Sequence, residues 1–463
     1  METITLAQLL QAVDGRLLGS EPPLDTPISR VDTDSRSIHP GSVFLPLVGE
    51  RFDGHAYIGP ALESGAAGCL TARERDCYRP DKFYVKVENT QRALRDLAAW
   101  YKSRFDIPYI AVTGSVGKTT AKDMLAAVLG AKYRVLKTEG NFNNDVGLPL
   151  TLLRLERAHQ ICVLEMGMDK LGEIDYLADI VKPDVGIITN IGDAHIERLG
   201  SRENIFRAKC ELLPHIKEDG LVILNGDDPM LASLRGRTPV HALFCGQGEG
   251  LDYRAQVLEG GGLSHIRCRL TTPHMDQEME IPALGAHMVY PALMAAAAAE
   301  HFGLTPDQIR QGLNSFVPTR MRMNILRRGE DITILDDTYN ANPQSMRAAI
   351  QVLADSQSGW KAAVLGDMLE LGPFAPALHR GVGECLGRAQ VDCLVAVGEL
   401  ASDIARGARE GGVPQVYHCD SKSAAKAVLD RIIRPGGAIL VKASRGMALE
   451  ELTAWLVEHT KEP

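Results

Sequence analysis

A glycine-containing turn at residues 113–120, Thr-Gly-Ser-Val-Gly-Lys-Thr-Thr, constrains the fold of this chain more than any other feature. It follows the apolar run Tyr109–Val112, which predicts a buried strand, and precedes Ala121–Leu129, which predicts a helix. Backbone N–H groups of such a turn and the helix dipole can bind phosphates, Lys118 can reach the β- and γ-phosphates, and the Thr119 hydroxyl can bind Mg²⁺. The alternative is an ordinary strand–helix turn with an exposed lysine. The flanking strand and helix favour nucleotide binding.

Short apolar runs alternate with helical segments after this turn. The runs Ile161–Leu164, Val185–Ile188 and Leu221–Leu224 predict a parallel sheet built from strand–helix–strand units. Polar residues such as Glu165 follow these strands directly. Because ligands bind outside the carboxyl ends of the strands in open α/β sheets, we expect the chemistry at this edge.

The chain of 463 residues is long enough for three domains at about 150 residues each. We predict an α/β protein with a small mixed α/β domain at residues 1–88, a central parallel-sheet P-loop domain at 89–317 and a Rossmann-like domain at 318–463. Strand-like pieces such as Tyr253–Leu258, separated by a turn at Gly260–Gly262, predict antiparallel strands appended to the central sheet.

Two further patterns support this division. Apolar positions recur at helical spacing over Arg92–Arg104, just after the first boundary. A second alternating series begins near Met323 and predicts the third domain. Its apolar runs are Ile332–Leu335, Ala362–Leu365, Leu394–Val397 and Ala438–Val441.

Composition excludes several classes of protein. The chain has 50 Lys and Arg against 59 Asp and Glu, a net charge of −9, which argues against a general affinity for nucleic acid or anionic lipid. The longest uncharged apolar stretch, Met288–Ala299, is shorter than the roughly 18 residues that span a bilayer, so we expect no membrane span. The start lacks a basic region followed by an apolar run, and the nine cysteines show no Cys-x-x-Cys pair. We therefore expect a cytoplasmic chain with reduced thiols.

The shortened loop Gly-x-x-Gly-Lys-Thr resembles the ATP-binding loop of the Mur ligase family, which also includes folylpolyglutamate synthases. Val112 stands where the general phosphate loop has its first glycine. Glu165 and His195, each just beyond a predicted strand, match the family's Mg²⁺-binding positions. Alone, such a glutamate is more often a solvated carboxylate and such a histidine a structural hydrogen bonder.

Lys209, in Arg-Ala-Lys-Cys-Glu at residues 207–211, resembles the family lysine that becomes carbamylated. An ammonium beside two metal ions would be repelled, whereas a carbamate is an anion that can help to hold them. The alternative is a surface lysine paired with a nearby glutamate. The amide-rich segment around Asn143 and Asn144 resembles a loop that faces the reacting groups, although Asn also favours turns for local reasons.

Polar clusters also follow two strands of the third predicted domain. The sequences Asp-Asp-Thr-Tyr-Asn-Ala-Asn-Pro at residues 336–343 and Lys-Ala-Ser-Arg at 442–445 resemble signatures of the family member that adds a dipeptide, and Gly366–Gly372 agrees with them. The alternative for the first cluster is a helix cap made by Asp336 or Asp337. No Asp-Asn-Pro-Arg stretch occurs, which speaks against the member that adds meso-diaminopimelate.

One further segment matches the family, and another departs from it. In the first predicted domain, Asp-Ser-Arg at residues 34–36 matches the family's UDP-binding module, and the alternative is an ordinary polar turn. Gly285–Pro291 departs from the family's Gly-x-His-Asn-x-x-Asn, because Met288 and Pro291 replace both amides.

The resemblance implies an ATP- and Mg²⁺-dependent ligase that joins D-alanyl-D-alanine to a UDP-N-acetylmuramoyl-tripeptide through an acyl phosphate, acting as a monomer. It implies catalytic roles for Lys118, Lys209 and His195 and metal binding by Thr119, Glu165 and His195. The implied ATP contacts are Gly114, Ser115, Val116, Gly117, Lys118, Thr119, Thr120, Arg322 and Asp337. Ser35 and Arg36 would bind the UDP moiety, and the residues expected to line the dipeptide site are Asn143, Asn144, Tyr339, Asn340, Asn342, Ser444 and Arg445.

Two rival functions stay open at this point. Another Mur ligase or a folylpolyglutamate synthase would share the loop but should lack the paired signatures at residues 339–343 and 442–445. A nucleotide-dependent switch or kinase-like protein would hydrolyse or sense ATP without joining two substrates.

Overall fold

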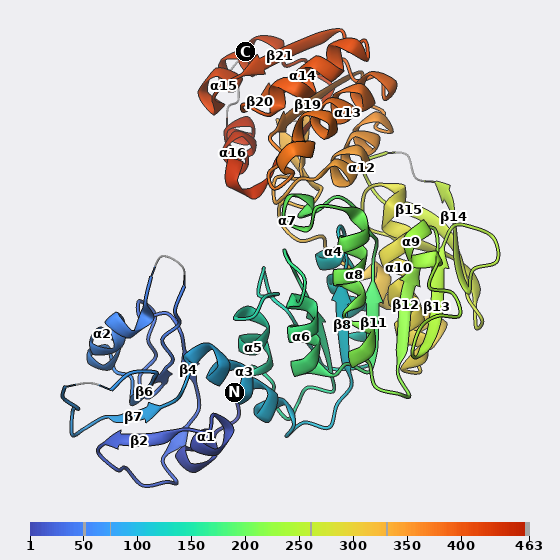
Figure 1. Ribbon diagram of the computed structural model, residues 1–463. Helices are drawn as coiled ribbons and strands as arrows, with labels where there is room; N and C mark the ends of the chain where they lie inside the picture. Colours follow the sequence, from blue (N-terminus) through green and yellow to red (C-terminus); the bar gives the residue numbers. More distant parts are fainter. Residues whose placement is uncertain (50–51, 75, 260–261, 330–331, 459–463) are drawn as a thin grey trace. The chain divides into compact units, whose positions relative to one another are not determined.

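The structure is a computed structural model, and it describes the chain except for residues 50–51, 75, 260–261, 330–331 and 459–463. The chain divides into two compact units, and Figure 1 draws their helices and strands coloured along the sequence. Unit 1 comprises Met1–Ala111, Tyr133–Gly167 and Glu173–Asp184. Unit 2 comprises Val112–Lys132, Met168–Gly172 and Val185–Pro463.

The first part of unit 1 is a small mixed α/β module. A five-stranded sheet has the order β2-β7-β6-β5-β4, in which only the β2–β7 pair is antiparallel, and β1 pairs with β3. A small core of Phe44, Ile58, Leu62 and Tyr84 packs helix α2 on this sheet. Its elements are β1 (Ile4–Thr5), α1 (Leu6–Ala12), β2 (Arg16–Gly19), β3 (Pro27–Ile28), β4 (Val31–Asp32), β5 (Val43–Phe44), η1 (Gly54–Tyr57), α2 (Ile58–Glu63), β6 (Gly68–Thr71) and β7 (Phe83–Lys86).

The rest of unit 1 consists of helices and parallel strands that follow this module. Helix α3 begins after Asn89, whose side chain caps it, and buries its apolar stripe against α5 and α6. Strands β9 and β10 pair in parallel. The elements are α3 (Thr90–Lys102), β8 (Tyr109–Thr113, of which Val112 and Thr113 belong to unit 2), β9 (Val135–Lys137), α5 (Gly147–Leu152), β10 (Ile161–Glu165) and α6 (Glu173–Val181).

The first part of unit 2 carries parallel strands β11 to β14 and then antiparallel strands β15 and β16. They belong to a nine-stranded sheet of order β16-β15-β14-β13-β12-β11-β8-β10-β9. Helix α4 packs against α10 and α11, and α10 is apolar on every side because it is buried. The elements are α4 (Lys118–Leu129), β11 (Val185–Ile188), α7 (Ile196–Leu199), α8 (Arg202–Cys210), η2 (Leu213–His215), β12 (Leu221–Asn225), α9 (Pro229–Ala232), β13 (His241–Gly246), β14 (Tyr253–Glu259), β15 (Ile266–Thr271), β16 (Asp276–Ile281), η3 (Ala286–Met288), α10 (Val289–His301) and α11 (Pro306–Asn314).

The last part of unit 2 is a six-stranded sheet of order β17-β18-β22-β19-β20-β21. All its pairs are parallel except β17–β18, as expected for a Rossmann-like domain with one antiparallel edge strand. The elements are β17 (Asn324–Arg328), β18 (Ile332–Asp336), α12 (Pro343–Ala354), β19 (Trp360–Gly366), η4 (Gly372–Phe374), α13 (Ala375–Arg388), β20 (Cys393–Val397), α14 (Ala401–Glu410), β21 (Gln415–Cys419), α15 (Lys422–Ile432), β22 (Gly437–Lys442), η5 (Arg445–Met447) and α16 (Glu450–Glu458).

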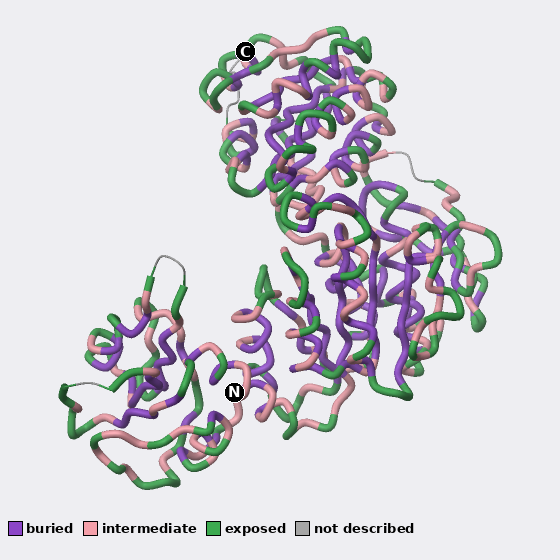
Figure 2. The backbone as a smooth tube through the Cα atoms, viewed as in Figure 1, coloured by how far each residue is buried: buried purple, intermediate pink, exposed green. Residues whose placement is uncertain are grey.

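The structure confirms the α/β class and the mixed, parallel and Rossmann-like sheets expected from the sequence. Every residue of β11 and β12 is buried, which explains their uninterrupted apolar runs (Figure 2). Strand β13 was not predicted, and α4 begins at Lys118 rather than Ala121. The turn expected at Gly260–Gly262 lies partly outside the described residues. Among the helices that the structure describes, none is long and apolar enough to cross a membrane.

Candidate functional site

The turn after β8 has the backbone geometry of a phosphate loop. Gly114 has a φ of +148°, and a Cβ there would lie 1.9 Å from Oγ1 of Thr189, so a side chain does not fit. Gly117 adopts the left-handed conformation directly before α4 begins at Lys118. The first N–H groups of a helix have no acceptor within the helix, so an anion at this end of α4 can accept their hydrogen bonds.

Residues that follow β11 hold this loop in shape. The amides of Ser115 and Val116 donate to the carbonyl and to Oδ1 of Asn190, each over 3.0 Å. The carbonyl of Val116 accepts hydrogen bonds from Oγ1 of Thr189 at 2.6 Å and Nδ2 of Asn190 at 2.9 Å. The amide of Gly192 donates to Oγ of Ser115 over 2.8 Å. The protein itself therefore preorganises the loop.

The functional groups of the loop have partners within unit 2. Nζ of Lys118 donates to the carbonyl of Gly114 over 2.8 Å. Nη2 of Arg322 donates to Oγ1 of Thr119 over 3.0 Å, and its guanidinium lies 4.2 Å from the ring centroid of Tyr339. Nε of Arg322 is buried without a hydrogen-bond partner among the described residues. A buried guanidinium N–H without an acceptor fits an anionic ligand.

The segment that carries Arg322 docks on helix α4. Oγ1 of Thr319 donates to Oδ2 of Asp123 over 2.5 Å, and Asp123 is 8% exposed. Met321 and Met323, on either side of Arg322, have φ values of 63° and 55°, a left-handed conformation that is strained in residues other than glycine. The start of the C-terminal part is thus fixed to the phosphate-loop helix.

Lys209 on α8 is 2% exposed. Burial, and then the nearby positive charge of Lys118, lower the pKa of Lys209 well below its ordinary value. A lysine in this setting loses its proton more readily, so a larger fraction is the nucleophilic neutral amine. The surface lysine paired with a glutamate, which was the alternative, is wrong because Lys209 is buried.

His195 lies at the N-terminus of α7 with a φ of 62°. Its Nδ1 lies 2.6 Å from Oε2 of Glu370, and this contact holds the pKa of Glu370 below its ordinary value. Nearby, Asp193 is 5% exposed and forms an ion pair with Arg202 through two contacts of 2.6 and 2.8 Å. That pair ties the turn that carries His195 to helix α8.

In unit 1, Glu165 and Asn143 lie together. Nδ2 of Asn143 donates to Oε1 of Glu165 over 2.9 Å, and Glu165 is 2% exposed. Oε2 of Glu165 is buried with no hydrogen-bond partner among the described residues. A buried carboxylate oxygen in this condition fits a bound cation. Oδ1 of Asn144 instead accepts from the amide of Gly147 over 2.8 Å, at the start of α5.

The polar cluster after β18 lies beside the one after β22. Nζ of Lys442 lies 2.5 Å from Oδ2 of Asp337 and donates to the carbonyl of Asn340 over 2.8 Å. Asn342 caps α12 through its side chain, so the cap expected as an alternative from Asp336 or Asp337 is made by a different residue.

The remaining C-terminal candidates face neighbouring loops. Oγ of Ser444 accepts from the amide of Leu369 over 2.9 Å. Nη1 of Arg445 lies 2.8 Å from Oε1 of Glu450 and 3.7 Å from Sδ of Met321. These contacts join the turn after β22 to the segment beside Arg322.

The predicted UDP-binding residues lie in an open loop of unit 1. Arg36 is 87% exposed and forms an ion pair with Asp34, whose pKa its guanidinium lowers to about 2. Ser35 lies between them and is partly exposed. This geometry leaves the guanidinium of Arg36 largely in solvent.

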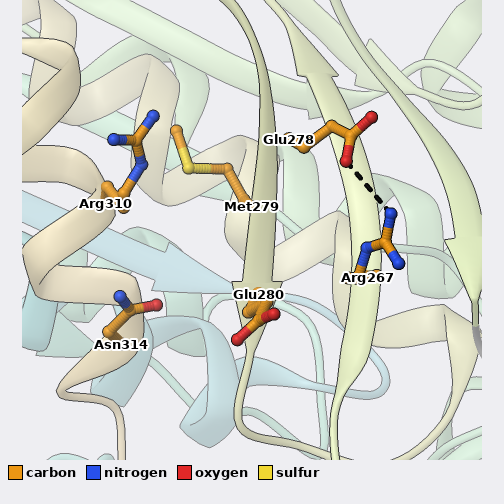
Figure 3. Close-up of a pocket in the computed structure, with 6 residues that line it drawn as sticks. All are labelled: Arg267, Glu278, Met279, Glu280, Arg310 and Asn314. Atoms are coloured by element: carbon orange, nitrogen blue, oxygen red, sulfur yellow. Dashed lines mark hydrogen bonds and ion pairs between the residues drawn. The ribbon is translucent and has the colours of Figure 1, made fainter.

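A pocket of about 250 Å³ lies between strands β15 and β16 and helix α11 (Figure 3). Among its charged residues, Arg267 pairs with Glu278, whereas Arg310 contacts Asp307 and Gln277, which do not line the pocket. None of the predicted site residues lines it, so we assign it no role. Among the described residues, no group of three or more His, Cys, Asp or Glu side chains is placed to hold a metal ion by itself. Mg²⁺ is commonly bound by one or two carboxylates together with substrate phosphates, which the residues here allow.

Three family models match the chain in order. They are "Mur ligase family, catalytic domain" at residues 27–102, "Mur ligase middle domain" at 112–299 and "Mur ligase, glutamate ligase domain" at 321–445. The chain belongs to the Mur ligase family and has its three-domain architecture.

Individual relatives match along almost the whole chain. UDP-N-acetylmuramoyl-tripeptide--D-alanyl-D-alanine ligase of Bacillus subtilis (strain 168) is 39% identical over 458 residues, 98% of each chain. A crystal structure of MurF from Acinetobacter baumannii has a TM-score of 0.91 at 35% identity and covers 99% of this chain and 100% of that one. MurF ligase from Thermotoga maritima, solved in complex with ADP, has a TM-score of 0.81 at 29% identity and covers 93% and 97%.

Several residues around the site were not assigned from the sequence. Thr189 and Asn190 shape the phosphate loop, Arg202 braces Asp193, and Glu370 contacts His195. The sequence offered two signals: Thr189 and Asn190 directly follow a strand, and Glu370 lies in the segment Gly366–Gly372 that resembles the family. The contacts themselves are tertiary.

Proposed function

We propose that this chain joins D-alanyl-D-alanine to a UDP-N-acetylmuramoyl-tripeptide with conversion of ATP to ADP and phosphate. The near full-length likeness to relatives of that name supports the substrates, and the ADP-bound relative supports the nucleotide. The structural observation that carries the proposal is the bond from Arg322 to Thr119, which attaches the C-terminal part to the phosphate loop.

The reaction needs an activated carboxylate. The terminal carboxylate of the tripeptide attacks the γ-phosphorus of ATP, giving an acyl phosphate and ADP. The amine of the dipeptide then attacks the acyl carbon, loses a proton, and displaces phosphate. Phosphorylation is required because a free carboxylate is a poor acyl donor, and catalysis of such transfers depends mainly on positioning and electrostatics.

The phosphate loop supplies the contacts to ATP. In the proposal, the amides of the loop and of the first turn of α4 bind phosphate oxygens, and Lys118 turns from the carbonyl of Gly114 to the β- and γ-phosphates. Arg322 exchanges Thr119 for a phosphate oxygen, and its buried Nε offers a second donor. The loop residues proposed to contact ATP are Gly114, Ser115, Val116, Gly117, Lys118, Thr119 and Thr120.

We propose Thr119, Glu165 and His195 as Mg²⁺ ligands, each from its own element. The unpaired Oε2 of Glu165 supports this assignment. Bound Mg²⁺ would neutralise charge on the transferring phosphoryl group. Carbamylation of Lys209 fits the same picture, because burial and Lys118 favour its neutral amine, and the carbamate would be an additional anionic ligand.

The first and third predicted domains would hold the substrates. We propose that residues 1–88 bind the UDP moiety through Ser35 and Arg36, and that residues 318–463 hold the dipeptide and part of ATP. Asp337, fixed by Lys442, would contact ATP. The residues proposed to line the dipeptide site are Asn143, Asn144, Tyr339, Asn340, Asn342, Ser444 and Arg445. The chain would act as a monomer.

Phosphate release tests the proposal directly. The enzyme is given ATP, Mg²⁺ and UDP-N-acetylmuramoyl-tripeptide, with D-alanyl-D-alanine, D-alanine, an L-amino acid or glutamate in separate reactions. Release that requires the dipeptide, together with a pentapeptide product by mass spectrometry, is the expected result. Release with another amine would reassign the substrate, and release without any amine would favour the nucleotide switch.

A further inference from the structure

The turn Met368–Gly372 follows β19 in the C-terminal part of unit 2, and the proposed reaction gives it no role. Two residues of the same C-terminal part hold its backbone. The amide of Met368 donates to Nε2 of His379, and the amide of Leu369 donates to Oγ of Ser444, each over 2.9 Å. Glu370 stands at the tip with a φ of 62°, a conformation that costs free energy in a residue other than glycine. The turn therefore holds the Glu370 side chain in a defined place.

Glu370 is aimed at the start of helix α7. The amide of Glu197 donates to the carbonyl of Glu370 over 3.3 Å. A Cβ on Gly372 would lie 2.8 Å from Cγ and 3.5 Å from Cα of Glu197, so Gly372 packs closely against this residue. Oε2 of Glu370 lies 2.6 Å from Nδ1 of His195. A strained backbone, a backbone hydrogen bond and a close glycine thus bring one carboxylate to one imidazole.

The contact determines which ring nitrogen of His195 can bind a metal. A carboxylate is an acceptor only, so it favours the tautomer with the proton on Nδ1. Nε2 then keeps its lone pair, and a carboxylate behind an imidazole also fixes the ring orientation. Among the described residues, no well-aligned hydrogen bond reaches Nδ1, and such contacts commonly tighten when the ligand binds.

We propose that Glu370 is a positioning residue, which holds the ring of His195 so that Nε2 keeps the lone pair that would bind the metal. This inference rests on the proposed role of His195 as a Mg²⁺ ligand. It gives the C-terminal part of unit 2 a share in the metal site, because Glu370 comes from that part and His195 from the turn that follows β11. Metal affinity would then depend on the docking of the Met368–Gly372 turn.

Metal binding without turnover tests the proposal. Mn²⁺ is titrated into the full chain with saturating ADP, and free Mn²⁺ is followed by electron paramagnetic resonance. We expect Glu370→Ala to raise the Kd for Mn²⁺ about 10- to 100-fold. Glu370→Gln keeps an oxygen acceptor and should recover most of the affinity. Glu218→Ala is the matched control, an exposed glutamate before β12 and away from this contact, whose Kd should equal that of the parent chain.

The decisive measurement is the double variant. His195→Asn should also raise the Kd, and adding Glu370→Ala to it should raise the Kd no further, because Glu370 acts through His195. Equal losses in both backgrounds, or no loss from Glu370→Ala when His195→Asn does weaken binding, would overturn the inference and leave the proposed function standing. No loss from His195→Asn would overturn both. A thermal melt of each variant checks that it is folded.

A second readout detects the tautomer itself. In metal-free protein labelled with ¹⁵N-histidine, the His195 signals, assigned by their loss in His195→Asn, should report a proton on Nδ1. Glu370→Ala should shift them toward the Nε2-protonated form, and Glu218→Ala should not. An unchanged tautomer in Glu370→Ala would contradict the proposal.

Discussion

Replacement of Gly114 by alanine should disable the phosphate loop while leaving the chain folded. The new Cβ would lie 1.9 Å from Oγ1 and 3.1 Å from the backbone N of Thr189, so either the loop or the end of β11 must move. The φ of +148° costs an alanine about 1–3 kcal/mol. Overpacking adds about 1–3 kcal/mol. Loss of the hydrogen bond from Thr189 to Val116 adds about 0.5–1.5 kcal/mol.

If the loop moves to make room for the Cβ, this free-energy cost lowers the affinity for the nucleotide. A penalty of about 3 kcal/mol on the loop corresponds to a more than 100-fold weaker binding of ADP, measured by calorimetry. Gly236→Ala is the control: its φ is +71°, and a Cβ there meets nothing within 4 Å, so it should cost about 1–2 kcal/mol of stability and leave ADP affinity unchanged. If Gly114→Ala bound ADP as tightly as Gly236→Ala, the claim that this glycine shapes the loop would be wrong.

Three further predictions follow from the same geometry. Lys118→Ala should abolish turnover and leave binding of the UDP substrate intact by calorimetry; equal loss of both would mean that the modules are misassigned. Arg322→Lys should weaken ADP binding about 10-fold, because the substitution replaces a guanidinium that stacks on Tyr339 and has several donors with a point charge. Unchanged affinity for ADP would contradict the proposed contact between Arg322 and the nucleotide. Lys209→Met should be more stable than the parent chain to urea at pH 7 in CO₂-free buffer. Lys209 binds a proton more readily in the unfolded chain than in the folded one, so the parent chain gains stability as the pH rises toward 10.5. The stability advantage of Lys209→Met should therefore shrink over that range. A constant difference would contradict the lowered pKa of Lys209.

Strands were the most predictable part of the fold because their sequences carry one unambiguous signal. The run Val185–Ile188 coincides with β11, and Leu221–Leu224 lies within β12, since strands buried on both faces need apolar residues at every position. Strand β13 was missed because only its last three residues are buried, which leaves no continuous apolar run. The start of α4 was placed late because a phosphate loop ends in polar residues that already belong to the helix.

The environment of the site was less predictable than its sequence motifs. The phosphate loop could be located from its own residues, but the amide of Val116 is held by Asn190, 74 residues away in the chain. The contact between His195 and Glu370 spans an even longer separation. Sequence patterns report local periodicity, whereas these contacts depend on which strand ends and turns the fold brings together. Asn342 shows the converse, because its helix-capping role is local and could have been derived from the Pro that follows it.

Burial and the positive charge at the phosphate loop explain how Lys209 could be modified without a dedicated catalytic residue. Burial disfavours the protonated form of Lys209, and repulsion from Lys118 disfavours it further, so the neutral amine that attacks CO₂ is already favoured. Once the carbamate forms, the charge at Lys209 changes sign and the repulsion from Lys118 becomes attraction. The modification would therefore relieve an unfavourable arrangement in the free protein and supply an anion for bound cations. The same lysine would weaken the fold before modification and strengthen the site after it.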